Sequence, residues 1–284
     1  MPITKLNTLL DNIQYQILTG LIISDASIIF KTKESKTPCF SITNITKDFI
    51  SDIQNKLPFK WHNVYIIPEH KRGNINAKES YILYSKADLG LLKERNRWYQ
   101  YNNELQKFVK IIPEDLEISP IMLKYWFYGD GWSSYISRTS SAIGLCTNGF
   151  TYEECIFLQK KLKIINLDFN VNKVCNKNIK TIYNKNRNYI LRTNRNTTIV
   201  DFFNYIGSCD IKGFMYKWKM PYPTIRKSLT PKEIIEIKTK ILHGVSNKIL
   251  SKEYDIDIGS VIDIKYNRIH KNILEQLNNP EIKE

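Results

Sequence analysis

The feature that most constrains the fold is an internal repeat with a spacing of about 105 residues. The segment Gly20-Leu-Ile-Ile-Ser-Asp25 has a counterpart in Tyr125-Trp-Phe-Tyr-Gly-Asp130. Three further matches follow in the same order, at offsets of 104 to 108 residues: Asn44 with Asn148, Leu57 with Leu162, and Tyr81-Ile-Leu83 with Tyr189-Ile-Leu191. One such match arises easily by chance, but four in the same order indicate two copies of one folding unit.

Each copy of the repeat is predicted to form an αββαββα unit. In the first copy an apolar helix ends near Asp25, and residues 47–57 carry apolar side chains at helical spacing. The four β-rich segments of this first copy are expected at 28–33, 39–43, 61–67 and 80–85. A closing helix completes the unit. We therefore predict an α+β fold with two pseudo-symmetric subdomains, over residues 1–115 and 116–225.

The pattern changes after residue 225, where three short helices are expected. Thr230-Pro-Lys-Glu233 has the composition of a helix start, with a capping Thr, a Pro in the first turn and a Glu three residues after the cap. A tight turn at Asp255-Ile-Asp257 separates the last two helices, as in a helix-turn-helix module. We predict that residues 226–284 form a small all-α, helix-turn-helix-like domain; a helical cap on the core is the alternative.

The charge balance predicts a polyanionic partner. The chain carries 42 Lys and Arg against 28 Asp and Glu, a net charge of +14, which favours nucleic acid over a membrane surface. A basic enzyme without such a partner is the alternative. Residues 226–284 hold 11 basic and 9 acidic side chains, so the repeated part supplies most of the attraction.

Zinc chemistry and membrane insertion are not expected. The five Cys form no C-x-x-C pair, and the four His show no H-E-x-x-H pattern. No apolar run approaches the roughly 20 residues of a transmembrane helix, and we expect no secretory signal.

The two repeated aspartates indicate a metal site. Asp25 and Asp130 each end an apolar helix, where the helix dipole disfavours a negative charge. If the two helices pack side by side, both carboxylates meet at one end and repel unless a proton or a cation lies between them. Oxygen ligands of this kind favour Mg²⁺, which in a basic protein points to phosphodiester cleavage. The alternative is that each Asp merely marks the end of a helix.

The two segments together resemble the paired motifs of the LAGLIDADG homing endonucleases. Leu18-Thr-Gly-Leu-Ile-Ile-Ser-Asp25-Ala matches the motif at its Leu, Gly, apolar and Asp positions. In Leu123-Lys-Tyr-Trp-Phe-Tyr-Gly-Asp130-Gly, only the first Leu and the Gly-Asp-Gly end agree well. The resemblance spans about residues 10–221 and is to the single-chain, two-motif, mitochondrial intron-encoded type. It implies a saddle-shaped antiparallel sheet in each half, a monomer, and a mitochondrial location.

The resemblance also implies an active site. Asp25 and Asp130, with the backbone carbonyls of Ser24 and Gly129, would bind Mg²⁺, for which Mn²⁺ can substitute. Lys110 and Lys217 would be the catalytic lysines, with Lys219 as a competing choice for the second. A phosphate contact or a plain surface charge is the alternative role for each lysine.

The outward side chains of the sheets would read double-stranded DNA in the major groove. From the first copy we expect Lys31, Lys33, Ser41 and Thr43 to contact DNA. From the second copy we expect Ser137, Arg138, Lys180, Lys185, Arg187, Arg192 and Arg195, and from the tail Lys265 and Arg268. Most of the basic residues would contact phosphates and set affinity rather than specificity.

Three functions remain open at this point. The first is a Mg²⁺-dependent endodeoxyribonuclease that cuts one long asymmetric site and promotes intron mobility. The second is a maturase that binds its own intron RNA, and the third is a transcription regulator in which the nuclease fold is inactive. The two aspartates favour the endonuclease, because neither other function needs them.

Overall fold

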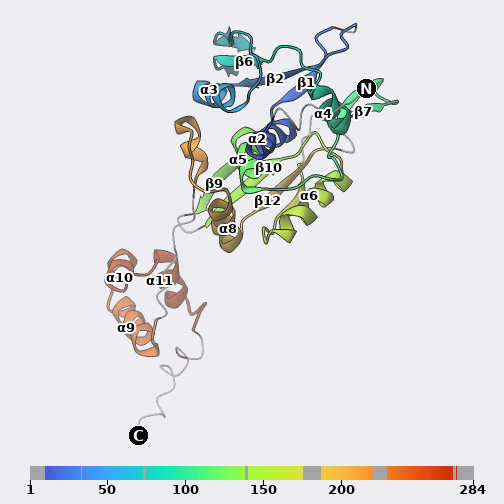
Figure 1. Cartoon of the computed structure of the whole chain (residues 1–284). Coiled ribbons are helices and arrows are strands. Elements are labelled where there is room, and N and C mark those ends of the chain that lie inside the picture. The colour runs from blue at the N-terminus through green and yellow to red at the C-terminus, as the bar shows by residue number, and fades with distance from the viewer. Residues whose placement is uncertain are drawn as a thin grey trace. The chain divides into compact units, whose positions relative to one another are not determined.

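The computed structural model describes residues 10–32, 34–72, 75–137, 140–174, 187–219, 229–270 and 273. The chain divides into two compact units, Met1–Tyr222 and Pro223–Glu284. The larger unit contains both copies of the repeat, and the smaller unit contains the C-terminal helices (Figure 1).

Two apolar helices lie side by side in the larger unit: α2 (Asn12–Ile23) and α5 (Pro120–Asp130) (Figure 1). Each begins at a polar cap, since the side chains of Asp11 and Ser119 accept backbone N–H groups of the first turn. Both helices are apolar around most of their circumference, which is typical of a helix buried on all sides.

A glycine allows these two helices to approach closely. A Cβ atom at Gly20 would lie 2.3 Å from the carbonyl oxygen of Met122 and 2.8 Å from the Cβ of Tyr125. The backbone of α2 therefore touches the backbone of α5, and no larger residue fits at this crossing without moving one helix.

Each copy contributes one four-stranded antiparallel sheet. The first has the order β1-β2-β6-β3, with β1 at Ser27–Ile29, β2 at Cys39–Asn44, β6 at Ser80–Tyr84 and β3 at Tyr65–Ile67. The second has the order β9-β10-β12-β11, with β9 at Gly131–Ser137, β10 at Ser140–Cys146, β12 at Tyr189–Thr193 and β11 at Asn170–Lys173. The same strand order in both sheets confirms the predicted α+β fold built from a duplicated unit.

Further helices complete each copy. They are α3 (Lys47–Lys56) and α4 (Leu91–Trp98) in the first copy, and α6 (Tyr152–Ile164) and α8 (Asn196–Ile206) in the second. A 3₁₀ helix, η1 (Lys212–Lys217), is the last element described in this unit.

The strand boundaries differ from the expectation in the first copy. The first strand is three residues long rather than six, and Trp61 forms only an isolated bridge with Ser85 ahead of β3. Two hairpins were not predicted: β4 (His70–Arg72) with β5 (Ile75–Ala77), and β7 (Tyr99–Asn102) with β8 (Lys107–Lys110). These strands are short and mostly polar, so they lack the apolar periodicity from which a strand is predicted.

One hydrophobic core runs through both copies. Phe49 of α3 contacts the rings of Tyr125 and Tyr128 on α5, at 6.2 and 5.7 Å between centroids. It also contacts Phe214 of η1 at 5.1 Å. An aromatic side chain of the first copy is thus packed among aromatic rings of the second, which explains why the two copies form one compact unit.

The C-terminal unit contains the three predicted helices: α9 (Pro231–Leu242), α10 (Asn247–Glu253) and α11 (Ile258–Lys265). Thr230 and Glu233 form the expected capping box at the start of α9. The unit has its own core, centred on Ile237, Leu250 and Val261. In the part of the chain described, no helix is long and apolar enough to cross a membrane.

The crossing of α2 and α5 predicts a stability effect. Gly20→Ala should lower the free energy of unfolding by roughly 1–3 kcal/mol, because the added methyl group overpacks a backbone contact. Gly149→Ala is the matched control, since a Cβ there meets nothing within 4 Å. Urea denaturation checks both variants; equal midpoints for the two would contradict the close crossing.

Candidate active site at the paired helix ends

The aspartates come together because the two helices also touch at their C-terminal ends. A Cβ atom at Gly129 would lie 2.5 Å from Ser24 Oγ and 3.3 Å from Asp25 Oδ2. The backbone immediately before Asp130 is therefore in contact with the residues that end α2. The side chain of Ser24 turns back to the helix and donates to the carbonyl of Gly20 at 2.9 Å.

The two carboxylates influence each other electrostatically. Burial and the neighbouring Asp25 carboxylate together raise the pKa of Asp130 to about 7. Burial also raises the pKa of Asp25, although a hydrogen bond from Asn44 and the charges of Lys217 and Lys110 oppose the shift. A cation between the carboxylates would remove this cost, so the pair favours a bound cation at neutral pH.

Each helix end also receives one lysine: Lys217 is buried and Lys110 is half-buried. Lys110 Nζ, at the end of β8, donates to the carbonyls of Ile22, Ser24 and Ala26 at 2.5, 3.1 and 2.8 Å. These oxygens lie at the C-terminal end of α2, where helix carbonyls have no intrahelical partner. The ammonium group also offsets the negative end of the helix dipole.

Lys217 makes the same arrangement in the second copy. Its Nζ donates to the carbonyls of Phe127, Tyr128 and Gly129 at 3.2, 2.6 and 3.1 Å, near the end of α5. Lys219, the competing choice, instead places its Nζ 5.6 Å from the centroid of the Tyr135 ring. Lys217 is therefore the lysine that corresponds in position to Lys110.

The two lysines share one electrostatic environment. Burial lowers the pKa of both Lys110 and Lys217 to about 8, against the opposing attraction of Asp25 and Asp130. The helix ends thus combine two acidic and two basic groups whose pKa values are all displaced toward neutrality. Such displaced pKa values are typical of sites that carry out chemistry.

The available donor atoms fit a hard divalent cation. Asp25 and Asp130 supply carboxylate oxygens, and the carbonyl oxygens of Ser24 and Gly129 lie beside them. Each of these carbonyls accepts one bond from a lysine, and a carbonyl oxygen has a second lone pair. In the described residues there is no cluster of three His, Cys, Asp or Glu side chains, so further ligands would be water or substrate oxygens.

Asn44 belongs to this site and was not predicted to do so. Its Nδ2 donates to Asp25 Oδ2 at 3.0 Å, and its Oδ1 accepts the backbone N–H of Thr46 at 2.9 Å. The repeat match of Asn44 with Asn148 had singled out the residue without giving it a role. Asn148 itself donates to Asn188 at 3.2 Å, so the two halves of the site are chemically different.

The structure places some of the predicted DNA-contacting residues on the outer faces of the sheets. Thr43 and Arg192 are exposed on their strands, and Ser41 is half-buried. Lys31 is exposed, with its Nζ 3.1 Å from His62 Nε2. Arg195 is exposed beyond β12 and forms an ion pair with Asp168 at 2.6 Å.

The remaining predicted residues lie elsewhere. Arg187 is only 7% exposed and donates to the carbonyl of Gly149, which leaves little of it for a phosphate. Lys265 and Arg268 are exposed in the C-terminal unit. Outside the described residues lie Lys33, Arg138, Lys180 and Lys185, and the side chain of Ser137.

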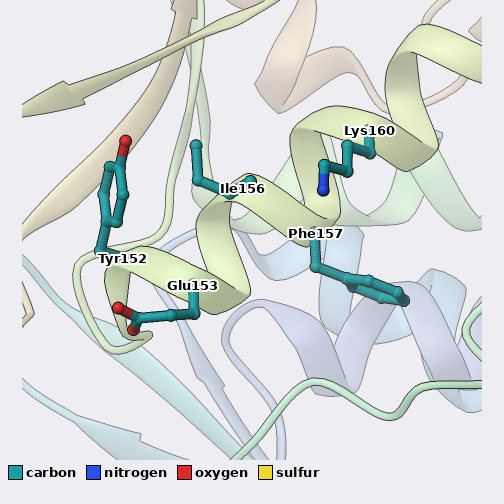
Figure 2. A pocket seen from close by; sticks show the side chains of 5 residues that line it. All are labelled: Tyr152, Glu153, Ile156, Phe157 and Lys160. Atoms are coloured by element: carbon teal, nitrogen blue, oxygen red, sulfur yellow. The ribbon is translucent and has the colours of Figure 1, made fainter.

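A hollow on the surface of α6 is a separate feature. Figure 2 shows its lining, which comes from one helix only: Tyr152, Glu153, Ile156, Phe157 and Lys160. None of these residues belongs to the paired helix ends, and the hollow has no part in the site described above.

Comparisons with known proteins agree with this architecture. The model of the LAGLIDADG DNA endonuclease family matches residues 15–194. An uncharacterized protein of Methanocaldococcus jannaschii, MJ1098, is 31% identical over 170 residues, 58% of this chain and 62% of that protein. The DNA endonuclease I-ChuI of Chlamydomonas applanata is 32% identical over 79 residues, 27% of this chain and 36% of that protein. The matches thus span less than two thirds of each of these relatives.

A solved structure shows the same fold. The homing endonuclease I-WcaI bound to its DNA recognition sequence superposes with a TM-score of 0.59 at 23% identity. The superposition covers 77% of this chain and 91% of that chain.

Burial of the Asp130 carboxyl group, together with repulsion from Asp25, predicts a pH-dependent difference in stability between the wild type and a variant without this carboxylate. A carboxyl group whose pKa rises from 3.8 to about 7 on folding favours the fold below pH 4, and this contribution is lost as the pH rises to 7. With metal removed by a chelator, Asp130→Asn should therefore be more stable than the wild type above pH 7, by up to about 4 kcal/mol. The difference should vanish near pH 4.

Thermal unfolding between pH 4 and 8 measures this effect. Asp201→Asn, which removes an exposed carboxylate on α8, should follow the wild type throughout. An advantage of Asp130→Asn that does not change with pH would show that ionisation of the Asp130 carboxyl group is not its cause.

Proposed function

Because the chain belongs to the LAGLIDADG DNA endonuclease family, we propose that it cuts one long, asymmetric site in double-stranded DNA in a reaction that needs a divalent metal, Mg²⁺ or Mn²⁺. The observation that carries this proposal is the matched set of two aspartates and two lysines at the joined ends of α2 and α5. Cleavage of such a site would serve the mobility of the intron that encodes the protein, in a mitochondrion.

Asp25 and Asp130 would hold the metal, together with the carbonyls of Ser24 and Gly129. When bound, the metal supplies an activated water and neutralises charge on the phosphate oxygens. Asn44 fixes the direction of the Asp25 carboxylate through its hydrogen bond, so that one oxygen is held in place before any ligand arrives.

Lys110 and Lys217 would act on the phosphate rather than on the metal. With a pKa of about 8, each Nζ is mostly protonated at neutral pH and carries its charge at a fixed place. A positive charge held by three carbonyls does not need to reorganise when negative charge develops on the cleaved phosphate. The two lysines would therefore stabilise the transition state at the two scissile bonds, one in each half.

The rest of the molecule would hold the DNA. The outward faces of the two sheets are separate four-stranded surfaces on one compact unit, suited to neighbouring segments of the major groove. The excess of basic residues before position 226 supplies attraction to the phosphates. Since both motif helices belong to one chain, we propose that the protein acts as a monomer.

The C-terminal unit would lengthen the DNA footprint as a helix-turn-helix-like module. Lys265 ends α11 and Arg268 follows it, both exposed, with Arg268 5.3 Å from the ring of Tyr266. Basic side chains at this end of the third helix suit phosphate contacts, which position a protein without reading sequence.

The aspartates give the first test of the function. Purified protein is incubated with a randomised duplex DNA library and either Mg²⁺ or Ca²⁺, and cut and bound molecules are sequenced. We expect the wild type to cut one long site with Mg²⁺, and Asp25→Asn and Asp130→Asn to lose at least about 1,000-fold in cleavage while still binding it. Asp201→Asn is the matched control and should cut normally. A wild type that cuts nothing but binds a structured intron RNA would replace the endonuclease with a maturase.

The lysines give an independent test with an internal control. Lys110→Met and Lys217→Met should each lower the cleavage rate by roughly 100-fold or more, because each removes a charge held at the helix ends. Lys219→Met, two residues away and directed at Tyr135, should stay within a few-fold of the wild type. Melting temperatures identify any variant that is simply unfolded. A larger loss for Lys219→Met than for Lys217→Met would reverse the assignment.

A further inference from the structure

One row of residues crosses the second sheet immediately beside the aspartates. The strand register pairs Trp132 with Gly144, Gly144 with Arg192, and Arg192 with Asn170, so that the row includes one residue from each strand. Trp132 is two residues after Asp130 and is the residue that β9 contributes to this row. On β12, Leu191 and Thr193 are buried while Arg192 between them is exposed, so Arg192 and its cross-strand partner Gly144 lie on the outward face of the sheet.

The indole of Trp132 lies across Gly144. A Cβ atom at Gly144 would be 2.6 Å from both Cε2 and Nε1 of Trp132, so the ring occupies the place where any other residue would have a side chain. Glycine at this position in a strand thus has a specific purpose, which is the close approach of a flat aromatic group. The ring becomes part of the outward surface of the sheet.

The guanidinium of Arg192 then packs against that ring. Its central carbon is 5.7 Å from the centroid of the Trp132 ring, within the range of a cation–π contact. An exposed arginine normally loses much side-chain entropy when it binds, and a contact made beforehand reduces this loss. Arg192 is therefore held in a direction fixed by Trp132 while its donors remain exposed.

The same row in the first sheet is chemically different. Ser27 pairs with Ser41, and Ser41 pairs with Tyr84, so two serines stand where the second sheet has Trp132 and Gly144. Tyr84 takes the place of Arg192, and Lys31 lies over its ring at 5.5 Å. Of these two corresponding rows, only the row in the second sheet contains an arginine packed against an aromatic ring.

We propose that Arg192 reads a guanine next to the cleavage centre, on the side of the second half, and that Trp132 is the positioning residue that makes this reading specific. The proposal rests on the proposed function, since it requires that the outward face of the sheet meets the major groove. A planar guanidinium donates to O6 and N7 of guanine together, which no other base pair allows in the same geometry. The closeness of Trp132 to Asp130 places this contact among the central bases of the site.

The test is a comparison of base preferences. Wild-type protein and variants are each used to select bound duplexes from a randomised DNA library, without cleavage, in Ca²⁺. The wild type should show one near-central position where guanine is preferred roughly 5- to 100-fold. Arg192→Lys keeps the positive charge but loses the planar guanidinium that donates to two acceptors at once. It should reduce the guanine preference to about twofold. Trp132→Leu and Gly144→Ser, which remove or displace the ring, should lower the guanine preference at the same position to a few-fold at most.

Three controls separate the outcomes. Lys163→Arg, at an exposed position of α6 that has no part in the proposed DNA surface, should leave the preferences unchanged. Trp132→Phe keeps an aromatic face and should restore part of the preference, which a purely structural role in folding would not predict. Melting temperatures show which variants are folded. If Trp132→Leu does not fold, Gly144→Ser still tests whether displacing the ring weakens the guanine preference.

Two failures have different meanings. If the wild type enriches a site but Arg192→Lys and Gly144→Ser give the same preferences, this inference is wrong while the proposed function stands. If the wild type enriches no sequence at all, the proposed function itself fails. Loss of the guanine preference in Trp132→Leu but not in Arg192→Lys would mean that the indole contacts the DNA directly, which also overturns the positioning role.

Discussion

The close crossing of α2 and α5 is the contact on which the rest of the molecule depends. It exists because Gly20 and Gly129 leave no side chain between the two helices, and because residues 17–23 of α2 and most of α5 are buried. The same contact forces two carboxylates together at one end, at a cost expressed in the raised pKa of Asp130. Burial of the helices offsets that cost, so the stable part of the fold maintains an arrangement that is locally unfavourable without a ligand.

The lysines show how one group serves both the fold and the site. A helix end buried in protein leaves carbonyl oxygens that need donors, and Lys110 and Lys217 each donate to three carbonyls there. Each lysine lies about 90 residues beyond the helix that it caps, at the end of its own copy. The site is therefore complete only when each copy has folded from its first helix to its last strand or turn. A single duplication accounts for both aspartates and both lysines.

The sequence was sufficient for the duplicated fold, because the repeat offsets carry over directly to the strand order of the two sheets. It was also sufficient for the aspartates, since an apolar helix that ends in Asp is visible without coordinates. The β7–β8 hairpin that delivers Lys110 was missed, because its strands are polar and short. The hydrogen bond from Asn44 to Asp25 depends on how β2 is placed against α2, which no spacing reveals. The same limit hid the burial of Arg187.

The two copies agree where they face the core and differ where they face outward. Ile42 pairs with Leu83 in the first sheet, and Leu145 pairs with Leu191 at the corresponding place in the second. The neighbouring pairs, one residue away along each strand, face outward. They are Ser41 with Tyr84 in the first sheet and Gly144 with Arg192 in the second. A shared core requires matched apolar volumes from both copies, since a change of even one methylene is felt in a packed interior. The outward positions are free of that requirement once both copies belong to one chain. A pseudo-symmetric protein can in this way acquire two different surfaces, and a DNA site read by two different surfaces has no need to be a palindrome.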